Sequence, residues 1–166
     1  MSQTGSHTST PEVEEASIDD LVCDVAAALH AGAPGSARHM VEHLRAPDLA
    51  DLIELLEPEA RLELILAFGL DFDFEVFSEL DETVRDQLSK ALPNDLLARA
   101  VRELDTDDAA YIIEGLEERD KEEVLAQLGT SDRAALERNL EYPEETAGRL
   151  MQAHFVAVAP FWTVRQ

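Results

Sequence analysis

The sequence predicts an all-α protein, a stacked array of short antiparallel helices that forms a small solenoid or superhelix. Three observations predict this fold. Apolar residues recur at helical spacing almost everywhere up to about residue 140. The segments with this spacing begin only about 11 to 14 residues apart, so each is too short to be stable alone and must bury its stripe against its neighbours. Proline, aspartate and glycine stand where such helices would begin or end.

The first expected helix begins after Ser17, a candidate N-cap, and ends at Gly32. Its inward face is Ile18, Leu21, Val22, Val25, Ala26 and Leu29. Cys23 is the single cysteine, which excludes an internal disulfide and a cysteine-based zinc site. We expect it to be a small buried residue and no nucleophile. A turn at 33–35 then leads to a second short helix, with Ala37, Met40, Val41 and Leu44 facing inward.

The later helices are expected to begin at regular intervals. Their predicted starts are Pro47, Pro58, Asp71, Asp81, Pro93, Asp105, about Arg119, and Ser131. The three prolines suit first-turn positions, where no N–H is missed. Asp81, Asp105 and Ser131 suit N-caps, and Gly69 and Gly129 suit helix ends. The clearest apolar stripe is Leu92, Leu96, Leu97, Ala100, Val101 and Leu104.

The charge is strongly acidic. The chain has 36 acidic and 13 basic residues and a net charge of −23, although 45% of its residues are hydrophobic. Residues 47–82 contain twelve acids and a single base, Arg61. Such a surface repels nucleic acid and anionic membrane and favours cations and basic proteins. For most single carboxylates, including Asp107 and Asp108, a solvated helix face or the charge of a helix start is the simplest interpretation.

Both ends of the chain differ from the helical part. Residues 1–17 are polar and acidic and are expected to form a flexible tail; they contain no secretory signal, and no segment is long enough to span a bilayer. We therefore expect a soluble, cytosolic chain. Residues 18–141 form the helical domain, and 142–150 are a loop or short helix. Residues 154–159 are a strand candidate, so 142–166 are expected to be a linker and the start of a second domain.

Three phrases carry a family resemblance. They run from Pro47 to Pro58, from Leu104 to Glu114, and from Tyr142 to Met151 (Tyr-Pro-Glu-Glu-Thr-Ala-Gly-Arg-Leu-Met). In this order they resemble the cytosolic N-terminal domain of MgtE-type magnesium transporters. The last phrase resembles the lead-in to that family's tandem CBS domains, and Phe155-Val-Ala-Val and Trp162-Thr-Val resemble the opening of the first CBS unit. The resemblance covers roughly residues 44–166.

The resemblance implies a right-handed superhelix that is followed by two CBS domains, a linking helix and a dimeric transmembrane pore. It implies that Mg²⁺ binds between the N-terminal and CBS domains and holds the pore closed. Glu75 and Asp107 match acidic positions of these sites, and the neighbouring Asp108 could substitute. A further acid expected one turn after Asp107 falls on Tyr111. The chain would then be a non-enzymatic regulatory domain that binds Mg²⁺ weakly, because the CBS domains complete each ligand shell, and that transports nothing alone.

Two alternatives remain open. One is a helical-repeat interaction scaffold, similar to the flagellar motor switch protein FliG, without ion sensing; the phrase from Tyr142 to Met151 favours the transporter domain over it. The other is a small metallohydrolase, because His39-Met-Val-Glu-His43 matches an H-x-x-E-H zinc motif. An exposed helix face is the simpler interpretation of this motif. The phenylalanines between Phe68 and Phe77 are expected to form core or a domain-contact face.

Overall fold

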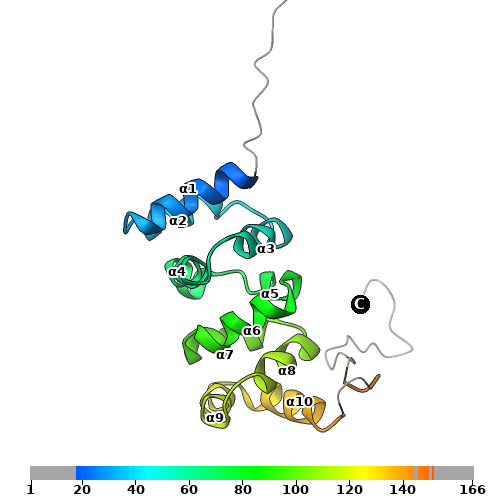
Figure 1. The fold of residues 1–166 in the computed structure, drawn as a ribbon. Helices are drawn as coiled ribbons and strands as arrows, with labels where there is room; N and C mark the ends of the chain where they lie inside the picture. Colours follow the sequence, from blue (N-terminus) through cyan, green and yellow to red (C-terminus); the bar gives the residue numbers. More distant parts are fainter. Residues whose placement is uncertain (1–17, 144–145, 150, 152–166) are drawn as a thin grey trace, which may run out of the picture.

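Every element of the computed structural model is a helix within the residues that it describes, namely 18–143, 146–149 and 151 (Figure 1). The elements are α1 (Ile18–His30), α2 (Pro34–Val41), α3 (Ala46–Leu55), α4 (Pro58–Phe68), the 3₁₀ helix η1 (Gly69–Asp71), α5 (Val76–Glu79), α6 (Glu82–Ala91), α7 (Asn94–Glu103), α8 (Thr106–Glu114), α9 (Glu118–Ala126) and α10 (Thr130–Leu140). The all-α prediction is confirmed for this part of the chain. No helix in it is long and apolar enough to cross a membrane.

The helices pile up in chain order, from α1 and α2 at one end to α9 and α10 at the other (Figure 1). On one side, α2 packs on α4, α4 on α6, and α7 on α9. On the other side, α3 packs on α5, and α8 packs on α10. The contact of α7 with α8 joins the two sides. The right-handed superhelix stays a prediction, and the tail with Ser17 and the strand at 154–159 lie outside the described residues.

The core runs through the whole pile, because each short helix contributes a buried stripe. The stripe predicted in and around α7, from Leu92 to Leu104, is buried along its whole length. Three phenylalanines are buried where α4 leads into α5, and Phe72 meets the Phe74 ring edge-to-face at a centroid distance of 5.3 Å. The phenylalanine group is therefore core, as expected, and it anchors the irregular segment between α4 and α5.

Local sequence signals place several helix ends as predicted. Pro47 lies in the first turn of α3, and Pro58 is the first residue of α4. Gly32 follows α1 with φ +69°, and Gly69 ends α4 with φ +58°. Both angles lie in the left-handed region, which glycine adopts without steric cost. The Asp81 carboxylate caps α6 by accepting a hydrogen bond from the Thr83 N–H at 2.9 Å.

Other predicted boundaries are wrong in detail. Gly129 does not end a helix; it is the N-cap residue of α10, and Ser131 lies inside the first turn of that helix. Pro93 is the N-cap residue of α7 rather than a first-turn residue. Around Asp71 the chain forms only η1, which ends at that residue, and then the four-residue α5. The buried phenylalanines hold this segment irregular, so it does not complete two turns.

The first helix is less buried than its pattern predicts. Val25 and Leu29 are buried, but Ile18 is 40% exposed and Cys23 is exposed. The expectation that Cys23 is buried is therefore wrong. The physical reason is that α1 is the outermost helix of the described pile, so neighbours cover only one of its faces.

Candidate functional site

The predicted site residues lie at the starts of α5 and α8, which are on the same side of the pile of helices. Glu75 immediately precedes α5, and Asp107 and Asp108 are in the first turn of α8. Phe74 and Val76, on either side of Glu75, are fully buried. Their burial turns the Glu75 side chain outward, where it is exposed.

A small acidic groove lies between α5 and the junction of α7 with α8. It has a volume of about 240 Å³, and its lining is Glu75, Ser78, Glu79, Glu103, Leu104 and Asp105. Asp105 occupies the N-cap position of α8, as predicted from the sequence. Glu103 pairs with Arg99 one turn earlier on α7. Four carboxylates around one hollow make this groove attractive to cations.

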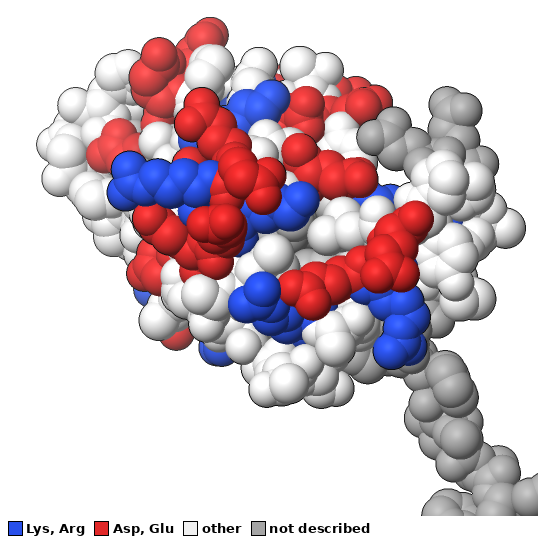
Figure 2. Space-filling view, turned by 90° about the horizontal axis from the view of Figure 1, so that it is seen from below, with Lys and Arg blue, Asp and Glu red and all other residues white. Residues whose placement is uncertain are grey.

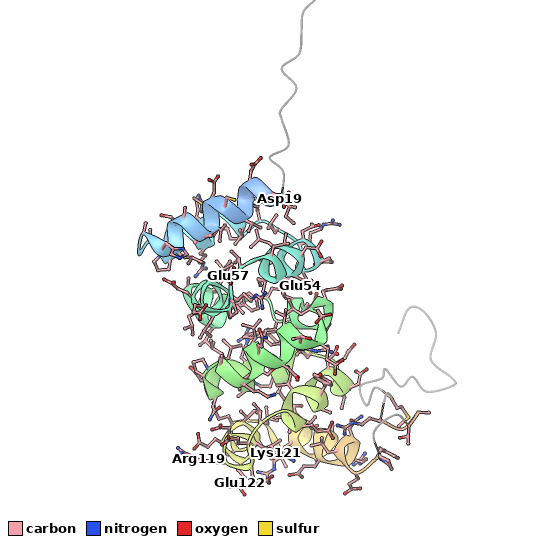
Figure 3. The ribbon with its side chains drawn as sticks, viewed as in Figure 1. Asp19, Glu54, Glu57, Arg119, Lys121 and Glu122 are labelled. Atoms are coloured by element: carbon pink, nitrogen blue, oxygen red, sulfur yellow. The ribbon has the colours of Figure 1, made fainter. Side chains whose placement is uncertain are left out.

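The charge is not the same over the whole surface. Figure 2 views the pile from the end formed by α9 and α10, and acidic and basic side chains intermingle there. Arg119 pairs with Glu123 at 3.0 Å, and Arg133 pairs with Glu137 at 2.8 Å. Figure 3 shows that Arg119, Lys121 and Glu122 lie at this end, far from Asp19. This end therefore presents paired charges of both signs, whereas the groove is lined by four carboxylates.

Asp108 belongs to a network that joins three helices. The Ser78 hydroxyl on α5 donates to Asp108 Oδ2 at 2.7 Å, and Arg85 Nη1 on α6 lies 3.4 Å from Asp108 Oδ1. The Arg85 guanidinium also stacks over the Tyr111 ring, 4.3 Å from its centroid. The Tyr111 hydroxyl in turn donates to Glu82 Oε1 at 2.9 Å. Both Asp108 oxygens are thus engaged inside the protein.

Tyr111 has a different role from that of the acid expected at its position. Burial, together with the hydrogen bond to Glu82 and the negative charge of Asp86, raises the pKa of Tyr111 to about 12. The phenol therefore stays protonated at neutral pH and acts as a donor to a carboxylate.

Glu75 and Asp107 have free ligand capacity. Among the described residues, the Glu75 carboxylate makes no hydrogen bond or ion pair, although its backbone N–H donates to Asp73 at 3.1 Å. Asp107 Oδ1 is shielded from solvent and has no hydrogen-bond partner in the same part of the chain. Carboxylate oxygens are the ligands that Mg²⁺ prefers, so both side chains fit a cation site. No three His, Cys, Asp or Glu side chains come together as a metal centre within the described residues.

The H-x-x-E-H motif does not form the arrangement that zinc hydrolysis needs. Helix α2 ends at Val41, so Glu42 is its C-cap residue and His43 lies beyond it. Residues four apart share a face only within a helix, and this spacing crosses a helix end. The His39 side chain is 84% exposed, and its Nδ1 lies 2.8 Å from Glu42 Oε1. The motif is an exposed local pair, as the simpler interpretation expects.

Sequence reasoning missed a second set of contacts, around the phrase from Tyr142 to Met151. Asn139 Nδ2 donates to the Arg149 carbonyl, and Arg149 Nη1 donates to the Asn139 carbonyl, both at 3.0 Å. The buried Arg149 also pairs with Glu114 on α8. A Cβ at Gly148 would lie 2.5 Å from the Tyr142 ring. Arg149 therefore links α8 to α10, a contact that we call the clasp, and the glycine and arginine of the phrase were the signals for it.

Comparisons with known proteins agree with this fold. The family model of the MgtE intracellular N domain matches residues 34–145. The magnesium transporter MgtE of Bacillus subtilis (strain 168) is 22% identical over 153 residues, which is 92% of this chain and 34% of the transporter. The chain thus spans about a third of that relative's length.

Two solved structures share the fold. The soluble part of a magnesium transporter matches with a TM-score of 0.68 and 18% identity, over 84% of this chain and 56% of that one. The cytosolic domain of the Mg²⁺ channel MgtE in complex with ATP matches with a TM-score of 0.68 and 27% identity, over 82% of this chain and 56% of that one. Because the family model covers most of the helical part, the chain belongs to the family of MgtE intracellular N domains.

Proposed function

We propose that this chain is a cytosolic regulatory domain of a magnesium transporter or channel. It senses intracellular Mg²⁺ through carboxylates that face the domains that follow it in the full-length protein. Family membership supports the transporter context. The observation that carries the sensing role is the pair Glu75 and Asp107, whose carboxylate oxygens have capacity that no described residue uses. The role is regulatory rather than catalytic.

The physical basis of sensing is charge repulsion that an ion relieves. Mg²⁺ keeps several of its waters and takes only a few carboxylates. Acidic side chains on two separate domains repel each other when no cation lies between them. A bound divalent ion cancels the repulsion and adds coordination, so the domains come together as Mg²⁺ rises. Each domain holds only part of the ligand shell, which keeps the affinity low enough to follow the cellular concentration.

The proposal extends to the rest of the full-length protein. The pile of helices is a right-handed superhelix, and the segment after residue 142 leads into two CBS domains. The clasp between Arg149 and Asn139 supports a fixed direction for the chain as it leaves α10. In the dimeric full-length protein, a compact cytosolic assembly at high Mg²⁺ closes the pore, and a loosened one at low Mg²⁺ opens it.

Limited proteolysis tests the proposal on a protein extended through the CBS pair. Mg²⁺ should protect this protein from cleavage, and Glu75→Ala and Asp107→Ala should each move protection to higher Mg²⁺. Glu122→Ala is the matched control, because it removes one exposed carboxylate from the mixed end of the pile (Figure 3). Calcium and sodium chloride at equal ionic strength control for screening of the large net charge.

Two outcomes would overturn it. If Mg²⁺ protects no better than sodium at equal ionic strength, the domain does not sense Mg²⁺, and a scaffold without an ion role is the better description. If Glu122→Ala weakens protection as much as Asp107→Ala does, the response is bulk charge screening and not binding at a site.

A further inference from the structure

We infer that Arg85 is a built-in cation for Asp108, so that Asp108 joins the helices without Mg²⁺ and is not one of its ligands. The inference rests on the proposed function in one respect, because it separates Glu75 and Asp107, which respond to Mg²⁺, from Asp108, whose charge Arg85 neutralises. Arg85 thereby determines that the Asp108 carboxylate needs no bound metal ion.

The position of Arg85 supports this role. Its side chain is only 16% exposed and that of Asp108 28%, so water screens their attraction incompletely. Ser78 from α5 and Arg85 from α6 both reach Asp108 on α8. One partly buried carboxylate is therefore shared by three helices, a bridging task of the kind that a metal ion performs elsewhere.

The guanidinium is also held from a second side. It lies over the Tyr111 ring, and Tyr111 is fixed in turn by its hydrogen bond to Glu82. Stacking against an aromatic face is a favourable contact for arginine and a poor one for a hydrated divalent ion. An acid at position 111 would offer a ligand, whereas the tyrosine offers a platform for the arginine.

Mg²⁺ could reach Asp108 only by displacing Arg85 or by lying beside it. Asp108 Oδ1 is 3.4 Å from the guanidinium, so an ion bound there would be close to a like charge. Glu75 and Asp107 have no such partner among the described residues. The structure thus separates Asp108 from its neighbour Asp107 although they are adjacent in sequence.

The first arm of the test needs no Mg²⁺. In EDTA, thermal unfolding is compared for the wild-type chain, Arg85→Gln, Asp108→Asn and the double variant. Each single variant should have a Tm about 4 °C or more below that of the wild type. The Tm of the double variant should be no lower than that of the less stable single variant, because the two changes remove one interaction. Fully additive losses would show that the residues do not act as a pair and would overturn the inference.

The second arm adds Mg²⁺ to the protein extended through the CBS pair. Asp108→Asn should keep the wild-type midpoint of Mg²⁺ protection within about twofold, whereas Asp107→Ala should shift it. In Arg85→Gln, Mg²⁺ should raise Tm by more than it does in the wild type, each measured against sodium at equal ionic strength, and this extra gain should vanish in the double variant. A shift in Asp108→Asn as large as that in Asp107→Ala would overturn the inference.

The two arms separate the two claims. If no variant responds to Mg²⁺ but the EDTA cycle shows coupling, the sensor proposal fails and the pairing of Arg85 with Asp108 stands. If Arg85→Gln does not fold, the inference is tested by the midpoint of Mg²⁺ protection in Asp108→Asn. Arg85→Lys then serves as the conservative variant, which should retain the charge and part of the stability.

Discussion

Arg61 is expected to stabilise the end of α3 through its guanidinium. It is the single base within residues 47–82. Its Nε donates to the carbonyls of Leu56 at 2.7 Å and Ile53 at 3.0 Å, and its Nη2 donates to the Glu54 carbonyl at 2.9 Å. The remaining Nη1 reaches Gln87 on α6 at 3.1 Å. The Ile53 carbonyl also accepts from the Leu56 N–H at 3.2 Å, so Arg61 shares that acceptor, and the carbonyls at this end of α3 carry the negative end of the helix dipole.

Arg61→Met keeps most of the side-chain stem and removes the charged donors. The Nε–H, which two carbonyls share, and the Nη2 donor to a third contribute about 1 kcal/mol each. The exposed bond to Gln87 and the helix dipole each add about 0.5 kcal/mol. The free energy of unfolding should therefore fall by about 3 kcal/mol. For a chain of 166 residues this corresponds to a Tm lower by about 6–12 °C.

Urea unfolding followed by far-UV circular dichroism measures this loss. The matched control is Arg119→Met, which removes a guanidinium that is 85% exposed and paired with Glu123 within one helix. Such a surface pair should contribute less than about 0.5 kcal/mol. Equal losses for Arg61→Met and Arg119→Met would refute the reasoning, since they would show that water satisfies the α3 carbonyls as well as Arg61 does.

Three further predictions concern the core, the clasp and Tyr111. Phe74→Ala should lower the free energy of unfolding by about 3–5 kcal/mol in urea, because the side chain is fully buried. Arg149→Met should increase hydrogen exchange in the segment after α10 while leaving α1 to α6 unchanged, since it removes the pair with Glu114. In a Tyr142→Phe variant, ultraviolet titration should show tyrosinate forming with a midpoint near pH 12. The pKa of Tyr111 is raised by folding, so its contribution to stability is complete below pH 10 and is lost as the pH rises from 10 to 12.

Each of these has its own control. Leu66→Ala, on the exposed side of α4, should cost much less than Phe74→Ala, and equal costs would contradict the assigned core. Arg133→Met removes an exposed pair on α10 and should leave hydrogen exchange after that helix unchanged; an increase equal to that of Arg149→Met would contradict the clasp. A tyrosinate midpoint near pH 10 in the folded protein would show that Tyr111 is not shielded.

Features set by neighbouring residues could be predicted from the sequence. The stripe from Leu92 to Leu104 gave the buried face of α7, because helical periodicity is a local property. Pro58, Gly69 and Asp81 marked helix ends through their own backbone preferences or short side chains. Glu75 was a candidate mainly through the family resemblance, because its position among phenylalanines separates it only slightly from other acids.

Features set by stacking could not be predicted in this way. Arg85 meets Asp108 from a position 23 residues earlier, and Arg61 caps a helix other than its own. Cys23 lies beside the apolar stripe of α1, and its exposure depends on whether another layer covers that face of the helix. Gly129 illustrates a local ambiguity, because a glycine between two helices can end the first or precede the second.

The most direct test of the central claim is small-angle X-ray scattering of the protein extended through the CBS pair, with Mg²⁺ titrated at constant ionic strength. The radius of gyration should fall as Mg²⁺ rises. Glu75→Ala and Asp107→Ala should move this transition to higher Mg²⁺, while Asp108→Asn should leave it in place. A radius of gyration that does not change with Mg²⁺ would contradict the account.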